Sequence, residues 1–331
     1  MHDMSKLDHE HGGRPLAAAH ETAHEERRAH LHGRLDTDDP EGPPRLGIIG
    51  AGRVGTVLGR SFAAAGWPVV AVASRDPARR ERFTAAVPGA RAYPEPAAVL
   101  DDVEIAFLTV PDDAVPAVAA GLRLYAGQGL VHTSGLLPAA VLAPAQGAGT
   151  LVASFHPLIA FADPEHALAA LPGATVALEG DEPLVALLAE LAHAVGAQPV
   201  RLPPGSKAAY HAAAVLAAGA EVALLEALAQ VARGAGLDER QALSVYLPLV
   251  RQTLDNAERL GIAAALTGPI VRGDVGTVVA HLEALERLAP EALPLYRAAA
   301  LRELAMAAES GEPEPGRVAA LRALLEPPSE R

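Results

Sequence analysis

The sequence has no cysteine among its 331 residues. Disulfide bonds, thiol catalysis and cysteine-ligated metal ions are therefore excluded. Aromatic residues make up only 3% of the chain whereas half of it is apolar, so its cores must be built largely from alanine, leucine and valine. Basic charge is also in short supply, and the formal net charge of −13 argues against nucleic acids and anionic membranes as partners.

Long uninterrupted apolar runs are missing as well. The longest apolar stretch, residues 211–232, is interrupted by Glu221 and Glu226. This pattern predicts a buried helix and not a membrane span. No signal-peptide pattern opens the chain, and the expected location is the cytoplasm.

Lysine is the scarcest of the charged residues, with only Lys6 and Lys207 in the chain. A lysine ammonium can donate a proton near neutral pH after burial, which an arginine cannot do. Tyr210 and His211 follow Lys207 by three and four residues, on the same face of a predicted helix. These three side chains are therefore candidates for the chemistry, although Lys207 could instead be a surface residue at a helix start.

A glycine pattern between a predicted strand and a predicted helix is the most specific signal that is present. The strand at 46–50 runs into a G-x-G-x-x-G motif, an alanine-rich helix follows, and a second apolar run lies at 69–73. In this β-α-β context the motif predicts a site for the pyrophosphate of a nicotinamide cofactor at the start of the helix. The residues expected to bind it are Gly50, Ala51, Gly52, Arg53, Val54 and Gly55.

The end of the second strand bears on the choice of cofactor. NAD-binding sites usually have an acidic residue there, but this sequence has Ser74 followed by Arg75. A guanidinium suits the 2′-phosphate of NADP, so we expect NADP(H) to be preferred over NAD(H). Three more arginines, at positions 79, 80 and 82, could instead form the solvated face of the next helix.

The remaining pattern divides the chain into a histidine-rich disordered tail (1–44), a Rossmann domain (45–203) and an all-helical domain (204–328). Strands and helices alternate in the Rossmann domain, which predicts an α/β fold with a doubly wound, mostly parallel sheet. Its predicted strands are 46–50, 68–73, 90–93, 104–110, 129–133, 150–155, 174–178 and 198–202, and its predicted helices are 53–65, 77–86, 112–121, 138–146 and 182–195. The second domain is predicted to contain helices at 206–234, 238–259, 274–288, 291–309 and 314–325.

The tail contains seven of the thirteen histidines and a formal H-E-x-x-H match from His20 to His24. No catalytic domain surrounds this match, and a tail offers no enclosed metal site. We therefore predict no functional metal, although adventitious zinc or nickel binding by the tail is left open.

Two segments follow predicted strands at their carboxyl ends, where a doubly wound sheet binds its ligands. Ser134 and Gly135 follow one strand and are expected to contact substrate. His156 follows another and precedes Pro157, in an extended turn that would face the site. His132 is either part of this site or a buried histidine with both ring nitrogens satisfied.

Two further segments complete the list of candidates. Thr109, Val110 and Pro111 end the fourth strand and are expected to pack around the nicotinamide ribose. Arg272 precedes Asp274, which is placed as a helix N-cap. Arg272 could hold an anionic group of the substrate, or it could pair with Asp274.

Taken together, these motifs resemble those of a known group. The chain resembles Rossmann-like proteins whose C-terminal half is a helical domain of unknown function, within the 6-phosphogluconate dehydrogenase-like enzymes. That set includes β-hydroxyacid dehydrogenases, ketopantoate reductase and pyrroline-5-carboxylate reductase. The resemblance covers about residues 45–290 and is carried by residues 50–55, 131–135, 154–158, 207–214 and 266–274.

The resemblance implies roles for particular residues. In β-hydroxyacid dehydrogenases a Ser-Gly after a strand binds the substrate carboxylate, and Ser134 and Gly135 match it. A lysine on the first helix of the second domain is their general acid, and Lys207 matches it. His211 stands where those enzymes have an asparagine, so their substrates are not carried over. The resemblance also implies a homodimer formed through the helical domain.

We therefore expect an NADPH-dependent oxidoreductase that transfers hydride to a carbonyl or imine carbon of a small polar metabolite in the cleft between the domains. Lys207 would exchange the proton, His211 or His156 would orient the substrate or relay that proton, and Tyr210 would contact the substrate. The alternatives are a non-catalytic NADP(H)-binding sensor or scaffold and, ranked lower, hydride transfer between NADP and a deazaflavin.

Overall fold

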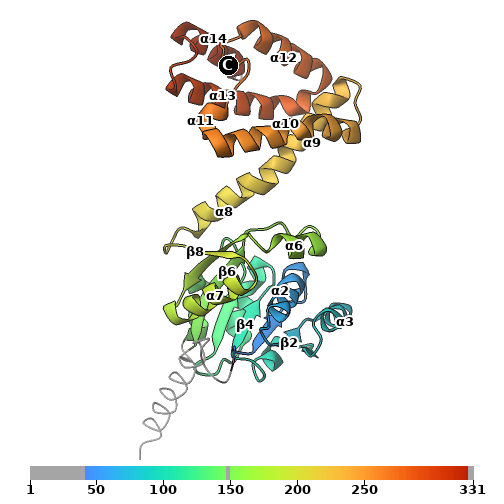
Figure 1. Ribbon diagram of the computed structural model, residues 1–331, viewed down its shortest axis with the longest axis vertical. Coiled ribbons are helices and arrows are strands. Elements are labelled where there is room, and N and C mark those ends of the chain that lie inside the picture. Colours follow the sequence, from blue (N-terminus) through green and yellow to red (C-terminus); the bar gives the residue numbers. More distant parts are fainter. Residues whose placement is uncertain (1–41, 147–149, 327–331) are drawn as a thin grey trace, which may run out of the picture. The chain divides into compact units, whose positions relative to one another are not determined.

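The computed structural model describes residues 42–146 and 150–326, which form two compact units (Figure 1). The first unit ends at Ala214 and the second begins at Val215. The predicted tail falls outside the described residues except for 42–44. The predicted domain boundary after residue 203 precedes this division by eleven residues. The intervening residues stay with the first unit because Lys207 bonds to Ser134 in the loop after β5 and Tyr210 bonds to His156 on β6.

The first unit contains an eight-stranded sheet in the order β3-β2-β1-β4-β5-β6-β7-β8. The first six strands in this order are parallel, whereas β7 runs antiparallel to β6 and β8 runs parallel to β7. The predicted α/β fold with a doubly wound, mostly parallel sheet is thus confirmed. The strands are β1 (Leu46–Ile49), β2 (Val69–Ala73), β3 (Arg91–Tyr93), β4 (Ile105–Leu108), β5 (Gly129–His132), β6 (Leu151–Pro157), β7 (Thr175–Gly180) and β8 (Gln198–Arg201).

Alternating residues of the central strands supply two separate cores, one on each face of the sheet. In β4, Ile105 and Phe107 pack into one core, and Ala106 and Leu108 pack into the other. This alternation follows from the two-residue period of a strand whose two faces are both covered by helices. Four of the five phenylalanines lie in the first core, and the rings of three of them, Phe62, Phe107 and Phe155, have centroids 5.2–5.8 Å apart.

Local capping signals explain where several helices of this unit begin. Asp76 caps the helix that starts at Pro77 by accepting the backbone N–H groups of Ala78 and Arg79. Asp163 caps a seven-residue helix that the sequence pattern did not predict. The helices are α2 (Arg53–Ala64), α3 (Pro77–Ala86), η1 (Pro96–Val99), η2 (Asp112–Ala114), α4 (Val115–Gly121), η3 (Ala139–Leu142), α5 (Ala143–Gln146), α6 (Pro164–Ala170), α7 (Glu182–Ala194) and α8 (Lys207–Val215).

The described part of the second unit is helical throughout, as predicted. Asp238 forms a capping box with Gln241, and Asp274 caps the next long helix through the N–H of Thr277. Its main core gathers residues from α12, α13 and α14 around Leu304 and Leu321. The helical segments are η4 (Leu216–Ala220, π-helical), α9 (Glu221–Gly234), α10 (Glu239–Leu260), α11 (Ile262–Ala265), α12 (Val275–Leu288), η5 (Pro290–Ala292), α13 (Leu293–Glu309) and α14 (Pro315–Leu325).

The long apolar helix that α8, η4 and α9 form together is not buried, contrary to the prediction. Leu216 and Val222 are each 67% exposed. Within the described residues this is the one helix, Lys207–Gly234, that is long and apolar enough by composition to cross a membrane.

Candidate active site

The glycine motif lies at the point where the strand order reverses, between β1 and β4. Gly50 has φ of +117°, and a Cβ placed there would come within 2.7 Å of the Thr109 carbonyl oxygen. A Cβ at Gly55 would come within 2.1 Å of the Gly50 carbonyl oxygen. The fold itself therefore requires these two glycines.

Gly52 differs from its neighbours in the motif. Its φ of −83° suits any residue, and a Cβ placed there would meet nothing within 4 Å. The protein does not need this glycine for its own packing. The open space at the start of α2 fits the close approach of a phosphate to the backbone.

The first turn of α2 has features that favour the binding of an anion. No side chain caps it, and it contains no acidic residue. Its N–H groups and the positive end of the helix dipole therefore favour a negative group. Ala51 is buried beside it, Val54 packs against the core, and the exposed Arg53 donates to the Ala162 carbonyl oxygen at 3.2 Å.

Thr109 supports the glycine turn from the end of β4. Its hydroxyl donates to the Gly50 carbonyl oxygen at 2.6 Å. Val110 is half-buried and Pro111 is exposed immediately after it. Thr109 thus has a structural role in the turn, and the predicted contacts of these three residues with a ribose stay a prediction.

The arginines after β2 have different environments. Arg79 pairs with Asp76 at 3.3 Å, and Arg80 donates to the Ser74 carbonyl oxygen at 2.5 Å. Arg75 is exposed and makes no hydrogen bond or ion pair within the described residues. Among the residues of this segment, Arg75 is therefore free to receive a phosphate.

Lys207 is only 2% exposed, so its interpretation as a surface residue is wrong. Its Nζ donates to the Ser134 carbonyl oxygen at 2.6 Å. Burial lowers the pKa of Lys207 to about 8, although the charges of Glu179 and Asp112 oppose this effect. Lys207 can therefore give or take a proton close to neutral pH.

The hydroxyl of Ser134 is occupied within the protein. It donates to Asp112 Oδ2 at 2.7 Å and accepts the N–H groups of Leu136 and Leu137 at 3.1 and 2.9 Å. Its single proton is thus committed to Asp112, and the predicted contact of Ser134 with substrate stays untested. Asp112 was not identified from the sequence, although an acidic residue right after Pro111 at the end of β4 is a usable signal.

Two histidines and a tyrosine meet at Gly135. Tyr210 OH lies 3.2 Å from His156 Nδ1, and the His156 and His211 rings are 5.9 Å apart. A Cβ at Gly135 would come within 2.4 Å of His211 Nδ1 and 2.8 Å of His156 Nε2. The structure therefore brings four of the predicted site residues together, and they need residue 135 to be glycine.

The protonation of this group follows from its burial. Burial, followed by the charge of Lys207, lowers the pKa of His156 to about 4, and burial raises the pKa of Tyr210. Both side chains are therefore neutral near pH 7. The buried His211 Nδ1 has no hydrogen-bond partner within the described residues, which leaves one polar atom for a ligand.

His132 is a satisfied, fully buried histidine. Its Nδ1 accepts the Ser134 N–H at 3.2 Å, so Nε2 must carry the proton that faces the Pro138 carbonyl oxygen at 3.3 Å. Burial lowers the pKa of His132 to about 4, in agreement with this neutral form. His132 thus supports the loop that contains Ser134 and Gly135.

Arg272 lies in the second unit, on the turn before α12, and is exposed. The Thr277 side chain and backbone lower the pKa of Asp274 most, with smaller contributions from Arg272 and Arg317. Asp274 is the predicted N-cap, and Arg272 makes no close ion pair with it. Within 42–146 and 150–326, no three histidine, aspartate or glutamate side chains are grouped to hold a metal ion.

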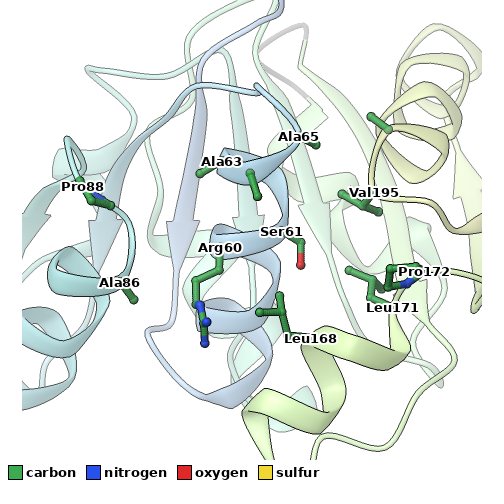
Figure 2. Close-up of a pocket in the computed structure, with 12 residues that line it drawn as sticks. Arg60, Ser61, Ala63, Ala65, Ala86, Pro88, Leu168, Leu171, Pro172 and Val195 are labelled. Atoms are coloured by element: carbon green, nitrogen blue, oxygen red, sulfur yellow. The ribbon is translucent and has the colours of Figure 1, made fainter.

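A groove of about 720 Å³ lies elsewhere on the first unit (Figure 2). Its walls come from the last turns of α2, the end of α3, α6 and the end of α7. Figure 2 shows Arg60 and Ser61 on α2 and Leu168 on the neighbouring α6. None of the predicted site residues lines this groove, so it is separate from the candidate active site.

Comparisons with known proteins agree with this architecture. Residues 36–157 match the Rossmann-like domain family, and residues 174–303 match the domain of unknown function DUF2520. A protein of Thermotoga maritima is 29% identical, with coverage of 80% of this chain and 99% of that one and a TM-score of 0.61. No curated protein matches the chain.

Two other solved structures show the same fold at lower identity. A protein of Bacteroides fragilis, provisionally assigned as an NADP oxidoreductase, is 21% identical over 79% of this chain and 98% of that one, with a TM-score of 0.65. An imine reductase from Pseudomonas sp. is 22% identical over 85% of this chain and 99% of that one, with a TM-score of 0.57. The chain therefore combines a Rossmann-like domain with the DUF2520 domain of unknown function, the combination that its sequence motifs predict.

Proposed function

We propose that the protein is an NADPH-dependent oxidoreductase that transfers hydride to a carbonyl or imine carbon of a small polar metabolite. The observation that carries this proposal is the buried Lys207, whose pKa of about 8 suits proton exchange near neutral pH. It lies among neutral histidines next to the carboxyl ends of β5 and β6. The activities of the Bacteroides and Pseudomonas proteins are of the same class.

The residues present fit a nicotinamide cofactor. The open space at Gly52 and the uncapped first turn of α2 suit a pyrophosphate, with Gly50 and Gly55 shaping the turn. The unpaired Arg75 suits a 2′-phosphate, and Ser74 beside it supports a preference for NADP(H) over NAD(H). When bound, the cofactor supplies the hydride.

The protein's own groups then have distinct tasks. The Lys207 ammonium is held by the Ser134 carbonyl oxygen and gives a proton to the developing oxygen or nitrogen of the substrate. His211 uses its unpartnered Nδ1 to orient the substrate, and His156, backed by Tyr210, borders the same space. Arg272 is proposed to contact an anionic group of the substrate.

The test is a screen of small aldehydes, ketones and cyclic imines with NADPH. The oxidation of NADPH is monitored by the loss of absorbance of its reduced nicotinamide. We expect at least one compound class to oxidise NADPH. Lys207→Ala should lower kcat by roughly 100-fold or more while NADPH affinity, measured by nicotinamide fluorescence, is kept. Unchanged turnover in Lys207→Ala would refute the catalytic role, and tight NADPH binding with no turnover would favour the sensor alternative.

We also propose that the protein is a soluble, cytoplasmic homodimer. The exposed apolar side of the helix from Lys207 to Gly234 supports the dimer, together with exposed Val245, Leu249 and Leu254 on α10. Exposed apolar area of this kind typically marks an interface. The chain's negative net charge disfavours an anionic lipid surface as the alternative cover.

A further inference from the structure

Asp112 is a charged residue of the site to which the proposed function assigns no role. It starts the short turn η2 directly after β4, and its carboxylate accepts the Ser134 hydroxyl at 2.7 Å. Its neighbour Asp113 is also exposed but has no side-chain hydrogen bond or ion pair within the described residues. The structure thus distinguishes two adjacent, chemically identical side chains.

Ser134 connects Asp112 to Lys207. The Ser134 hydroxyl binds Asp112 on one side and the N–H groups of Leu136 and Leu137 on the other, which fixes the turn after β5. The carbonyl oxygen of the same residue accepts the Lys207 Nζ at 2.6 Å. A change at Asp112 would therefore be felt by Lys207 through a single intervening residue.

Asp112 also acts on the site through its charge. It favours the protonated forms of Lys207, His132 and His156. The groups that face Lys207 from the surrounding elements are Asp112 after β4, His132 on β5, His156 on β6 and Glu179 on β7, with Tyr210 and His211 on its own helix.

We propose that Asp112 is a positioning residue that holds the Ser134 turn in place and thereby fixes the ammonium group of Lys207. The importance of Asp112 for catalysis rests on the proposed function, in which Lys207 is the proton donor. The Asp112–Ser134–Lys207 hydrogen bonds, in contrast, are present in the protein without substrate. The positioning role is therefore testable without a known substrate.

The composition of the chain makes a direct measurement possible. Lys6→Arg leaves Lys207 as the single lysine, so a protein labelled with ¹³C-lysine gives one side-chain signal by NMR. Its chemical shift against pH reports the protonation of Lys207. The variants are Asp112→Ala, which removes both the charge and the acceptor of the Ser134 hydroxyl, the matched control Asp113→Ala, Ser134→Ala, which keeps the carbonyl group, and the Asp112→Ala/Ser134→Ala double variant.

We expect Asp112→Ala and Ser134→Ala each to shift the midpoint of the Lys207 titration downward, because the ammonium loses support. Asp113→Ala should leave it unchanged. The double variant should shift it less than the sum of the single shifts, since both changes break the same connection. Near-ultraviolet circular dichroism and NADPH titration establish that each variant is folded.

Two results would overturn the proposal. An unshifted midpoint in a folded Asp112→Ala protein would show that Asp112 does not affect Lys207. Fully additive shifts would show that Asp112 acts only through its charge and not through Ser134. If the substrate screen fails but the shifts appear, the positioning role stands and the proposed reaction is what needs revision.

Discussion

At the scale of single residues, Gly135 shows how a missing side chain shapes this site. The space that its Cβ would fill is bordered by ring nitrogens of His156 and His211, which come from β6 and α8. Two imidazoles can approach the loop this closely because nothing projects from residue 135. The requirement for glycine therefore comes from the site and not from its φ, which is not in the left-handed region.

Gly135→Ala should displace one or both imidazoles and lower kcat/KM by about 100-fold, since displacements near 1 Å have costs of this order. The stability loss from overpacking should be about 1–3 kcal/mol. Kinetics on a substrate from the screen and thermal unfolding measure the two effects. A matched control is Gly121→Ala, at the exposed end of α4, where an added Cβ meets nothing within 4 Å; equal activity losses in both variants would contradict the explanation.

The pH dependence of the reaction follows from Lys207. Its pKa is lowered from 10.5 to about 8, so the ammonium form dominates below pH 8 and the neutral amine above it. The value of kcat/KM for reduction should therefore fall as pH rises through about 8. In the oxidative direction, which needs the neutral amine, it should rise through the same pH.

The measurement is a pair of pH–rate profiles, one in each direction. His156 and His132 should not contribute a limb near pH 6.5, because burial lowers the pKa of each to about 4. A reduction profile that is flat between pH 6 and pH 10 would mean that Lys207 is not the proton donor.

At the scale of elements, the junction between β2 and α3 contains the residues on which the proposed preference for NADP(H) rests. Asp76 caps α3 and holds Arg79, and Arg80 folds back onto the Ser74 carbonyl oxygen. Only part of the arginine cluster is thus available to a ligand. The sequence alone could not separate these roles because all the arginines lie within one short segment.

Arg75→Glu should weaken NADPH binding by roughly 10- to 100-fold, the effect of losing a hydrogen bond between charged groups. NADH binding should change little, because the 2′-phosphate is the group that Arg75 is proposed to contact. Fluorescence titrations with both cofactors measure this. Arg82→Glu, an exposed change on α3, is the control, and equal weakening of NADPH and NADH by Arg75→Glu would rule out 2′-phosphate recognition.

At the scale of the whole molecule, the helix from Lys207 to Gly234 has an exposed apolar side that the proposed dimer would bury. A stable interface usually buries about 1,600 Å² in total. Some residues of α9 and α10 pack around Ala232 and Ala242, but Leu216 on η4, Val222 on α9 and Leu249 on α10 are exposed. A second copy of the chain is the proposed cover.

Light scattering after size-exclusion chromatography should give a dimer in the absence of detergent. Leu216→Asp combined with Val222→Asp should shift the population toward monomer, because both side chains are 67% exposed in the single chain and would lie in the interface. Val200→Asp, on β8 and 45% exposed, should not. A wild-type monomer that binds lipid vesicles would instead favour a membrane role.

The sequence by itself determined the order and type of the main elements. Every predicted strand is present within two residues at either end, and so are the predicted helices, some of them as a 3₁₀ turn joined to an α-helix. These features depend on local patterns: a two-residue period in strands, glycine in turns, and aspartate at positions 76, 238 and 274. Of the helical segments, α6, α11 and η1 were missed, because four to seven residues carry little periodic signal.

Only the tertiary structure decided which residues form the site and which surfaces are covered. Lys207 and Ser134 are 73 positions apart, and Asp112 and Ser134 are 22 apart, so no local pattern links them. The parallel sheet brings them together because it gathers the ends of β4, β5 and β6 at one edge. The exposure of the apolar helix could not be predicted from the sequence either. Composition shows that an apolar helix must pack against other residues, but not whether these belong to the same chain or to another.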